Sequence, residues 1–327
     1  MNGMIFVSLM FVALEGAIML LLPHYSPRQF LFAVTVDPGF RTSTAARDAL
    51  RRYHRAVAGV VALTALAVLV TQSLPNLAFA LAGLTPLVAG MAAFLRERNA
   101  VRRLAASAHD VREADLSAQD ERIPRWCWLA LPPFAAPAAA ALYLRARWDD
   151  IQPRFPVHWG IDGPDRWASK TAAQVYGSLL FAAVLMLLML AITVATFYGA
   201  RRTPQRRVIL KVMVLAMYLL ASMFTAVGLH PLFAFSIWWI VVPVCLFAIV
   251  ITVWLYRVFN DPKHPAEATP DECWYLGMFY YNPQDPAVFV QRRVGLGYTF
   301  NFGSVWAWII LGGTVATTIG LAVAIRV

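Results

Sequence analysis

Long apolar stretches separated by polar connections dominate this chain of 327 residues. A helix needs about 20 mostly apolar residues to cross a bilayer. Eight segments approach that length with little charge at their centres: 4–22, 56–74, 77–95, 126–144, 176–199, 208–229, 233–256 and 305–325. Short connections at Pro75 and near His230 predict two tight helical hairpins. The pattern predicts an all-α polytopic membrane protein with about eight transmembrane helices.

The composition agrees with this interpretation. Hydrophobic residues make up 60% of the chain and charged residues 14%, whereas soluble domains have about 45–50% and about 25%. Cys127, Cys245 and Cys273 are far apart, which predicts neither a disulfide framework nor a zinc knuckle. The apolar start has no basic region and no small-residue cleavage site, so we expect it to be retained as the first transmembrane helix.

Basic residues are distributed unevenly between the loops. The chain carries 28 Lys and Arg, and with eight helices 22 of them fall on one side of the membrane. Cytoplasmic loops are the ones enriched in Lys and Arg. We therefore expect that side to be cytoplasmic, and both termini to lie outside a bacterial-type plasma (inner) membrane. The net charge of +10 then requires no nucleic-acid partner, and we expect none.

Two segments on the cytoplasmic side are predicted to be more than connectors. Residues 29–36 form a β-type run, and the hydroxyls that follow at 42–44 can cap a helix running into the second span. Residues 257–304 contain aromatic β-type runs divided by turn signals. We expect both segments to form a small cytoplasmic β-element. The expected domains are a three-helix membrane region (1–125), a four-helix membrane region (126–256), and the aromatic segment with the last helix (257–327).

Two loops carry dense motifs. The external one includes His158, Asp162, Gly163, Asp165, Trp167 and Lys170. It resembles the signature of domain of unknown function 1648 of SdpI-like membrane proteins, with one residue fewer between Gly163 and Pro164. The internal one resembles a second uncharacterised family, 5808, over residues 274–302. The residues that we single out there are Trp274, Gly277, Tyr280, Tyr281, Asn282, Asp285 and Asn301.

The resemblance to SdpI-like proteins implies immunity to secreted, membrane-acting peptides, or sensing that recruits a cytoplasmic repressor. We therefore expect a non-enzymatic immunity or sensor protein. Its partners would be membrane lipids, a peptide toxin outside and a regulator inside, and we expect no cofactor. Two other classes stay open: a membrane-embedded enzyme, metal-dependent in one form, that acts on a lipid or peptide at the outer leaflet, and a small transporter.

The external candidates each have a structural alternative. Glu15 lies near the middle of the first span, where an ionisable group is costly and by default functional, yet it could also bond between helices. His158, Asp162 and Asp165, with His230 as a further ligand, could bind a divalent ion. The same residues fit a structured turn, with Asp bonded to the turn backbone and tryptophans at the membrane interface.

The internal candidates are equally open. Asn282 and Asp285 could bond their own backbone in a turn or grip a cytoplasmic partner. Asn301 precedes the last span and could cap that helix. We expect the arginines of this loop, Arg293 among them, to contact anionic lipid headgroups. Asp271 and Glu272 beside Cys273 are a weaker indication of an enzyme, because the predicted topology separates them from His158.

Overall fold

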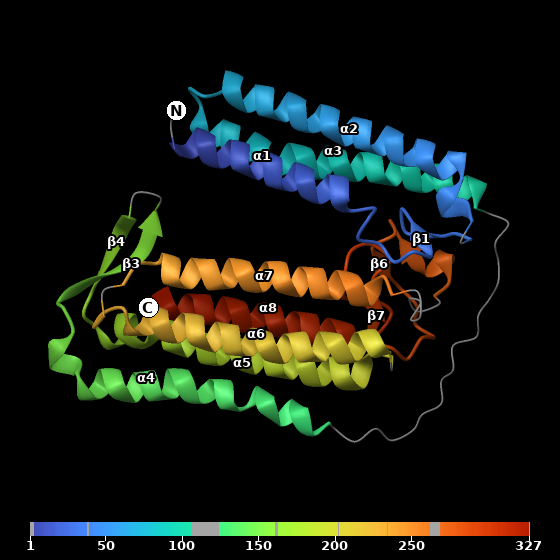
Figure 1. Cartoon of the computed structure of the whole chain (residues 1–327). Coiled ribbons are helices and arrows are strands. Elements are labelled where there is room, and N and C mark those ends of the chain that lie inside the picture. Colours follow the sequence, from blue (N-terminus) through green and yellow to red (C-terminus); the bar gives the residue numbers. More distant parts are fainter. Residues whose placement is uncertain are drawn as a thin grey trace. The chain divides into compact units, whose positions relative to one another are not determined.

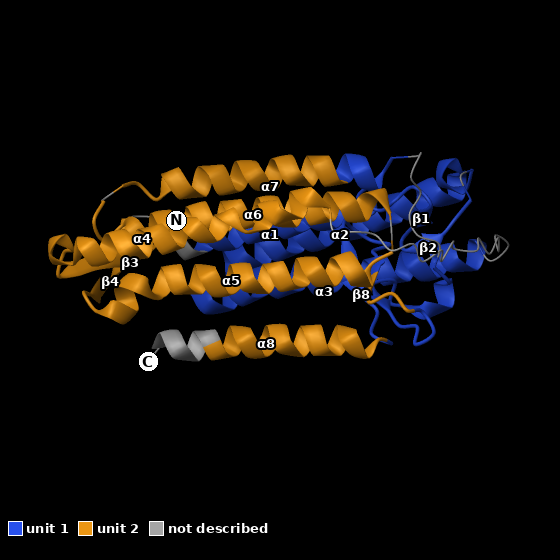
Figure 2. Cartoon of the chain, turned by 90° about the horizontal axis from the view of Figure 1, so that it is seen from below, with its two compact units in different colours: residues 1–116, 256–285, 290–303 blue, residues 117–255, 286–289, 304–327 orange. Residues whose placement is uncertain are grey.

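The computed structural model describes residues 3–37, 39–105, 124–160, 163–201, 203–233, 235–261 and 269–326. Within these ranges the chain is mostly helical and divides into two units. Unit 1 comprises residues 1–116, 256–285 and 290–303, and unit 2 comprises residues 117–255, 286–289 and 304–327 (Figure 2). Most of the predicted cytoplasmic segment 257–304 therefore belongs to the same unit as the N-terminal helices.

Unit 1 is built on three helices that pack side by side (Figure 1): α1 (Gly3–Leu21), α2 (Thr44–Val70) and α3 (Pro75–Leu104). The predicted cap at the start of α2 is confirmed, because the Ser43 hydroxyl accepts a hydrogen bond from the Ala46 amide at 3.2 Å. Gly16 allows a close approach of α1 to α2, since a Cβ there would lie 2.6 Å from a methyl carbon of Val61.

Short strands in unit 1 confirm the predicted β-element. β1 (Phe30–Leu31) pairs with β2 (Val34–Thr35), and β5 (Trp274–Tyr275) pairs with β6 (Phe279–Tyr280). β7 (Phe289–Gln291) pairs with β8 (Tyr298–Phe300). The short turns η1 (Phe40–Thr42) and η5 (Asp271–Cys273) flank these strands. Phe289 itself belongs to unit 2, and the rest of these strands belongs to unit 1.

The turn between β1 and β2 is held by packing. Phe32 and Ala33 both have positive φ, 48° and 63°, a conformation that costs about 1–2 kcal/mol for a residue other than glycine. Both side chains are fully buried, and the Phe32 ring meets Tyr53 and Phe94 edge to face at 5.3 and 5.5 Å. Burying a Phe side chain contributes about 1.5–3 kcal/mol. This packing fixes the hairpin against α2 and α3.

Unit 2 holds the remaining α-helices of the described chain: α4 (Ala135–Ala146), α5 (Ala172–Gly199), α6 (Pro204–Leu229), α7 (Trp238–Phe259) and α8 (Val305–Arg326). The last turn of α7 belongs to unit 1. The predicted helical segment over 126–144 begins as 3-10 turns, over Arg125–Ala130 (η2) and Pro132–Phe134 (η3), and continues as α4. Pro132 and Pro133 lack the N–H donors that an α-helix requires.

Arg206 joins the two longest helices of unit 2. Its Nη1 donates to the carbonyl oxygens of Phe197 and Ala200 at 2.9 and 3.3 Å, and the guanidinium lies 5.3 Å from the centre of the Phe197 ring. The last carbonyls of a helix have no partner within the helix. Arg206 is 3% exposed. From the first turn of α6 it donates hydrogen bonds to carbonyl groups at the C-terminal end of α5.

Six helical segments of the described chain are long and apolar enough to cross a membrane: Thr44–Val70, Pro75–Leu104, Arg125–Ala146, Ala172–Gly199, Pro204–Leu229 and Trp238–Phe259. Two further apolar helices are shorter over their described side chains, Ile5–Leu21 and Val305–Gly320. The structure thus supports a helical membrane protein without fixing the count at eight. The connection after His230 is longer than the predicted tight hairpin, because α7 begins at Trp238.

Candidate functional site

The motif that the sequence predicts to be external forms a β-hairpin rather than a turn alone. β3 (Arg154–Gly160) pairs antiparallel with β4 (Gly163–Ser169), with Phe155 opposite Ala168 and an irregular register around His158. Gly163 has φ +116°, which glycine adopts at no steric cost. The sequence left a structured turn open as one interpretation of these residues. It gave no clear alternation for the strands, because most side chains of β4 face solvent.

His158 and Asp165 face each other across this hairpin. His158 Nδ1 and Asp165 Oδ1 are 2.5 Å apart, and both side chains are 53% exposed. An exposed pair of this kind contributes little to stability, so it orients the two side chains. Asp162, which the sequence left open as a third metal ligand, lies outside the described residues. Within the described ranges, no group of three or more His, Cys, Asp or Glu side chains could hold a metal ion.

His230 packs beside the hairpin. Its ring meets the Trp159 ring edge to face, with 4.8 Å between centres, and its Nε2 lies 3.3 Å from the Phe235 carbonyl oxygen. The side chain is 9% exposed. The contact with Trp159 gives His230 a packing role between the end of α6 and β3.

The base of the hairpin is tied to the neighbouring helices. The Lys170 amide donates to the Pro153 carbonyl at 2.9 Å, and its ammonium group lies 5.1 Å from the centre of the Trp148 ring, in the short turn η4 (Trp148–Asp150). Cation–π contacts at exposed sites contribute about 0.5–1 kcal/mol. Thr171 then caps α5 by accepting from the Gln174 amide. Trp167, near this base, is 52% exposed.

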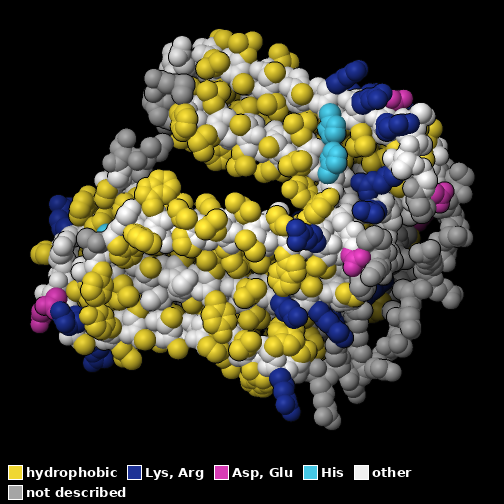
Figure 3. Space-filling model, viewed as in Figure 1, with side chains coloured by type: hydrophobic (Ala, Val, Ile, Leu, Met, Phe, Trp, Pro, Cys, Tyr) yellow, Lys and Arg dark blue, Asp and Glu magenta, His cyan; other side chains and the backbone are white. Residues whose placement is uncertain are grey.

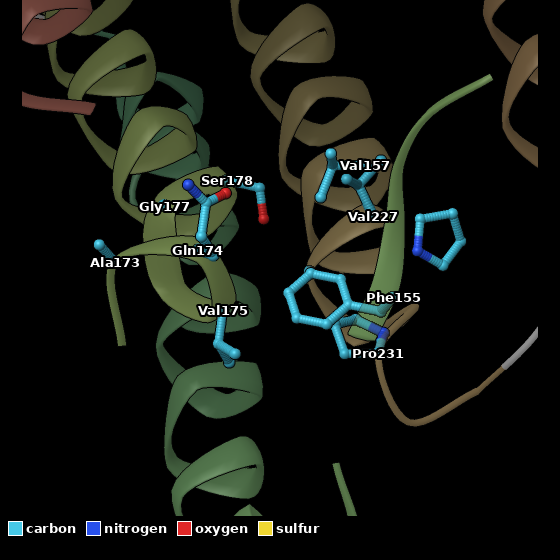
Figure 4. Close-up of a pocket in the computed structure, with 11 residues that line it drawn as sticks. Phe155, Val157, Ala173, Gln174, Val175, Gly177, Ser178, Val227 and Pro231 are labelled. Carbon is cyan, nitrogen blue, oxygen red and sulfur yellow. The ribbon is translucent and has the colours of Figure 1, made fainter. Parts of the chain in front are cut away.

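A pocket of about 190 Å³ lies between β3, the start of α5 and the end of α6 (Figure 4). Phe155 and Val157 lie on one side of it, and Gln174 and Ser178 lie on the other (Figure 4). The remaining lining residues are Pro156, Ala173, Val175, Gly177, Val227, Gly228 and Pro231. The lining is mostly apolar, and the two polar side chains on α5 are the exception. Such a pocket suits an apolar group with a polar edge.

Two glycines shape this pocket. A Cβ on Gly228 would lie 2.5 Å from Leu179 Cδ2, so this glycine allows the close packing of α5 against α6. A Cβ on Gly177 would meet nothing within 4 Å. A side chain introduced at Gly177, which lines the pocket, would therefore have room.

Glu15 lies in α1, partly buried. Its Oε2 is buried and has no hydrogen-bond partner among the described residues. The bond between helices that the sequence left open is thus not made by this oxygen. A carboxylate oxygen without a partner at this depth is a candidate for binding a proton or a cation.

The internal motif is tied together by Tyr280 and Asp285. The fully buried Tyr280 donates its hydroxyl to Asp285 Oδ2 at 2.9 Å and accepts from Asn282 Nδ2 at 3.3 Å. Burial and the Asp285 carboxylate raise the pKa of Tyr280, although the bond from Asn282 opposes them. Asn282 also forms the predicted turn, because its Oδ1 accepts from the Gln284 amide at 3.0 Å. The Asp285 carboxylate bonds to Tyr280, a partner that the turn interpretation did not anticipate.

Asn301 ties two loops together, and the predicted role as a helix cap is wrong. Its Oδ1 accepts from the amides of Asn282 and Gly303, both at 3.0 Å, and its Nδ2 donates to the carbonyls of Asn282 and Asp285 at 2.9 and 3.1 Å. The side chain is fully buried. α8 begins only at Val305. The side-chain amide of Asn301 instead forms hydrogen bonds with the backbone of the 282–285 turn.

Arg293 is buried in unit 1, which overturns the expectation that it contacts lipid headgroups. Its side chain is 1% exposed and forms an ion pair with Asp271. Its Nη1 also donates to the Ala33 carbonyl at 3.2 Å. The guanidinium lies between two aromatic rings, 4.9 Å from the centre of Phe30 and 5.1 Å from that of Trp274. Arg293 therefore joins the β1–β2 hairpin to the internal motif.

Asp271 completes this ion pair. Burial alone would raise the pKa of the Asp271 carboxyl. The charge of Arg293 and hydrogen bonds from Thr35 and Arg293 outweigh burial and lower that pKa below its ordinary value. Thr35 Oγ1 donates to Asp271 Oδ1 at 2.7 Å. The Asp271 carboxylate thus has a structural role, as the partner of Arg293 and Thr35.

Gly277 allows the internal motif to lie against the β1–β2 turn. Its φ is +73°, and a Cβ there would lie 2.6 Å from Ala33 Cβ and 2.8 Å from Arg98 Nε. Arg98 Nη2 donates to the Trp274 carbonyl at 3.2 Å. Tyr281, in contrast, is 47% exposed and meets Tyr275 edge to face at 6.3 Å. Of the residues singled out in this motif, Tyr281 has the surface that a partner could reach.

A family model described as a family of unknown function (DUF5808) matches residues 283–308. The matched segment includes Asp285, Arg293 and Asn301, whose contacts are described above. No curated protein and no solved structure matches the chain. The later part of the internal motif is therefore similar to a family whose function is unknown.

Proposed function

We propose that this chain is a membrane recognition protein of the SdpI-like immunity or sensor type, which binds a membrane-active peptide at the β3–β4 hairpin. The observation that carries the proposal is the apolar pocket that the hairpin makes with α5 and α6. The exposed Trp167 and the resemblance of the hairpin sequence to the SdpI-like signature add to it.

The size of the pocket fits one apolar side chain. An apolar cavity of about 150 Å³ is large enough to bind benzene, and this pocket measures about 190 Å³. Peptides that act on membranes present Phe, Leu or Trp side chains at the bilayer interface. One such side chain can enter between Phe155 and Ser178, while the rest of the peptide lies along the hairpin.

The finer topology is part of this proposal. We take α1 and α8 as spanning helices as well, which gives eight spans with both termini outside the plasma membrane. The support is the distribution of charge, with 22 of 28 Lys and Arg in the loops then inside. The hairpin faces outwards in this arrangement, towards a secreted peptide. The β-element that contains β5 and β6 faces the cytoplasm in this arrangement.

Replacing Gly177 with Leu is expected to weaken peptide recognition without unfolding the protein. Gly177 lines the pocket, so we expect the new side chain to narrow it, and leucine has a higher helix propensity than glycine. Excluding one apolar side chain of the peptide removes about 1.5–3 kcal/mol of burial, which corresponds to about 10–100-fold weaker binding. The measurement is survival of cells that express each variant, across a panel of membrane-active peptides.

The matched control is Gly83→Leu in α3, where a Cβ also meets nothing within 4 Å. This variant adds the same side chain to a helix of unit 1 and should protect cells as well as the wild type. If Gly177→Leu protected equally well, or if the wild type protected against no peptide of the panel, the proposal would be wrong.

A second candidate function is proton or cation transport through Glu15. The buried Oε2 without a partner among the described residues supports it. In liposomes that contain a pH-sensitive dye, Glu15→Gln should then reduce proton uptake to the rate of protein-free liposomes. Asp48→Asn, which removes an exposed acid paired with Arg51, is the control and should retain the wild-type rate. Equal rates for wild type and Glu15→Gln would exclude this function.

A further inference from the structure

We infer that a pair of stacked histidines in unit 1, His24 and His54, binds the phosphate of an anionic lipid headgroup. His24 follows the C-terminal end of α1, and His54 lies in the N-terminal half of α2. Their rings are 5.5 Å apart between centres and nearly parallel, at 5°. His24 is exposed and His54 is half-buried, so a ligand can reach the pair from outside the protein.

The hydrogen bonding of His54 leaves one nitrogen for a ligand. Its Nε2 lies 3.2 Å from the Leu20 carbonyl oxygen. A carbonyl oxygen only accepts, so Nε2 carries the proton in the neutral ring and Nδ1 is the atom that gains one on protonation. A protonated imidazole donates charge-assisted hydrogen bonds, which are about twice as strong as neutral ones.

Among the described residues, the charged groups that shift the pKa of His24 are cationic side chains. The charge of Arg41, in η1, lowers the pKa of His24, and the charge of Arg28 lowers the pKa of Arg41. The end of α7 contributes Tyr256, which meets Tyr25 edge to face at 5.5 Å. None of the interactions that shift the pKa of His24 or Arg41 comes from a carboxylate.

The nearest acidic residue on α2, the helix that carries His54, already forms an ion pair. Asp48 in α2 pairs with Arg51 at 3.5 Å. Arg41 itself donates to the carbonyl oxygens of Pro23 and Pro27 at 3.1 and 3.3 Å, which holds the loop that carries His24 and Arg28. The described part of this cluster thus presents positive charge without its own counter-ion, and an anion would supply one.

The position of the cluster indicates where that anion comes from. Histidine side chains lie where the apolar surface of unit 1 meets its Lys- and Arg-rich end (Figure 3), and His24 and His54 are the described histidines of this unit. Ile18 and Leu21, which precede His24 in α1, are about half exposed and apolar. Tyrosines such as Tyr25 and Tyr256 are enriched at the membrane interface. A lipid can therefore lie along α1 with its phosphate at the histidines.

The charge of His24 makes this binding depend on pH. Burial, His54 and Arg41 lower the pKa of His24, although a backbone hydrogen bond to Leu20 opposes them. An unperturbed histidine titrates near pH 6.5, so His24 becomes charged only at more acidic pH. A phosphate that binds the charged form is bound more tightly as pH falls, and each pKa unit by which it favours that form gives about tenfold.

The test is calorimetric titration of the detergent-purified full chain with dihexanoyl-phosphatidylglycerol at pH 5.5 and pH 7.5. We expect about tenfold tighter binding at pH 5.5. Dihexanoyl-phosphatidylcholine, which has a phosphate but no net charge, should bind more weakly and without this pH dependence. Glycerol phosphate, which carries the phosphate without the acyl chains, should also bind more weakly at both pH values.

Variants locate the site. The double variant His24→Gln and His54→Gln should lose the pH dependence, and His24→Gln alone, a change at an exposed side chain, should lose part of it. His158→Gln, which removes an exposed histidine of unit 2, should retain it. Unchanged pH dependence in both His24 variants would overturn the site. Glycerol phosphate that binds as tightly as the lipid would overturn the lipid as its ligand.

Discussion

Replacing Arg293 with Ala is expected to lower the free energy of unfolding of the protein by about 3–5 kcal/mol, the range for removing one partner of a buried ion pair. The side chain of Arg293 is 1% exposed and binds Asp271, the Ala33 carbonyl and the Thr269 carbonyl. Its removal leaves the Asp271 carboxylate without its cation and two carbonyls without a donor. It also empties the space between Phe30 and Trp274.

The shape of the guanidinium matters as well as its charge. Arg293 binds a carboxylate and two carbonyls with separate N–H groups while it stacks on two aromatic rings. A lysine has the charge but neither the planar fork nor the stacking face. Arg293→Lys should therefore recover only part of the loss. Arg292, the neighbouring residue, is exposed and donates to the Tyr298 carbonyl at 3.0 Å, so it provides the matched control.

The measurement is unfolding in mixed detergent micelles, followed by tryptophan fluorescence. Arg292→Ala should change the free energy of unfolding by less than about 1 kcal/mol, as most surface substitutions do. A loss for Arg293→Ala no larger than that of Arg292→Ala would mean that the buried ion pair does not hold the β1–β2 hairpin to the internal motif.

Arg293 also shows what the sequence could not predict. Basic residues in a loop between apolar helices indicate contact with lipid headgroups, and nothing next to Arg293 in sequence marks it as different from Arg292. Its partners at Ala33 and Asp271 are 260 and 22 residues away along the chain. Burial of an arginine is decided by such distant groups, which a local pattern does not contain.

Other features were local and could be predicted. Ser43 caps α2 because a hydroxyl precedes a helical run, and the Asn282 side chain bonds the Gln284 amide because Asn favours such turns. The 3-10 start of the fourth span had a visible signal in Pro132 and Pro133, but the apolar length of the segment outweighed it. The pocket at Gly177 could not be predicted, since it depends on how β3 meets α5 and α6.

Replacing Asn301 with Ala is expected to lower the free energy of unfolding by about 3–4 kcal/mol. The substitution removes four hydrogen bonds. A typical hydrogen bond contributes about 0.5–1.5 kcal/mol, and a buried polar group left without a partner costs about 1–3 kcal/mol. Asn301 is fully buried, so water cannot reach these groups without opening the loop.

The geometry of the amide makes a second variant informative. Asn301→Asp retains an oxygen for the amides of Asn282 and Gly303, but it directs a carboxylate oxygen at the carbonyls of Asn282 and Asp285. Two facing acceptors repel each other, so this variant should lose at least as much stability as Asn301→Ala. Gln284→Ala, at an exposed position of the same loop, should stay within about 0.5 kcal/mol of the wild type.

The same mixed-micelle unfolding experiment measures all three variants. A loss below about 1 kcal/mol for Asn301→Ala would show that water replaces the amide. The loop would then keep its conformation without this side chain. The expected larger loss would explain why an asparagine is needed here. One buried side chain must accept two hydrogen bonds and donate two, which an amide can do. It would also account physically for a residue in the segment that resembles the family of unknown function.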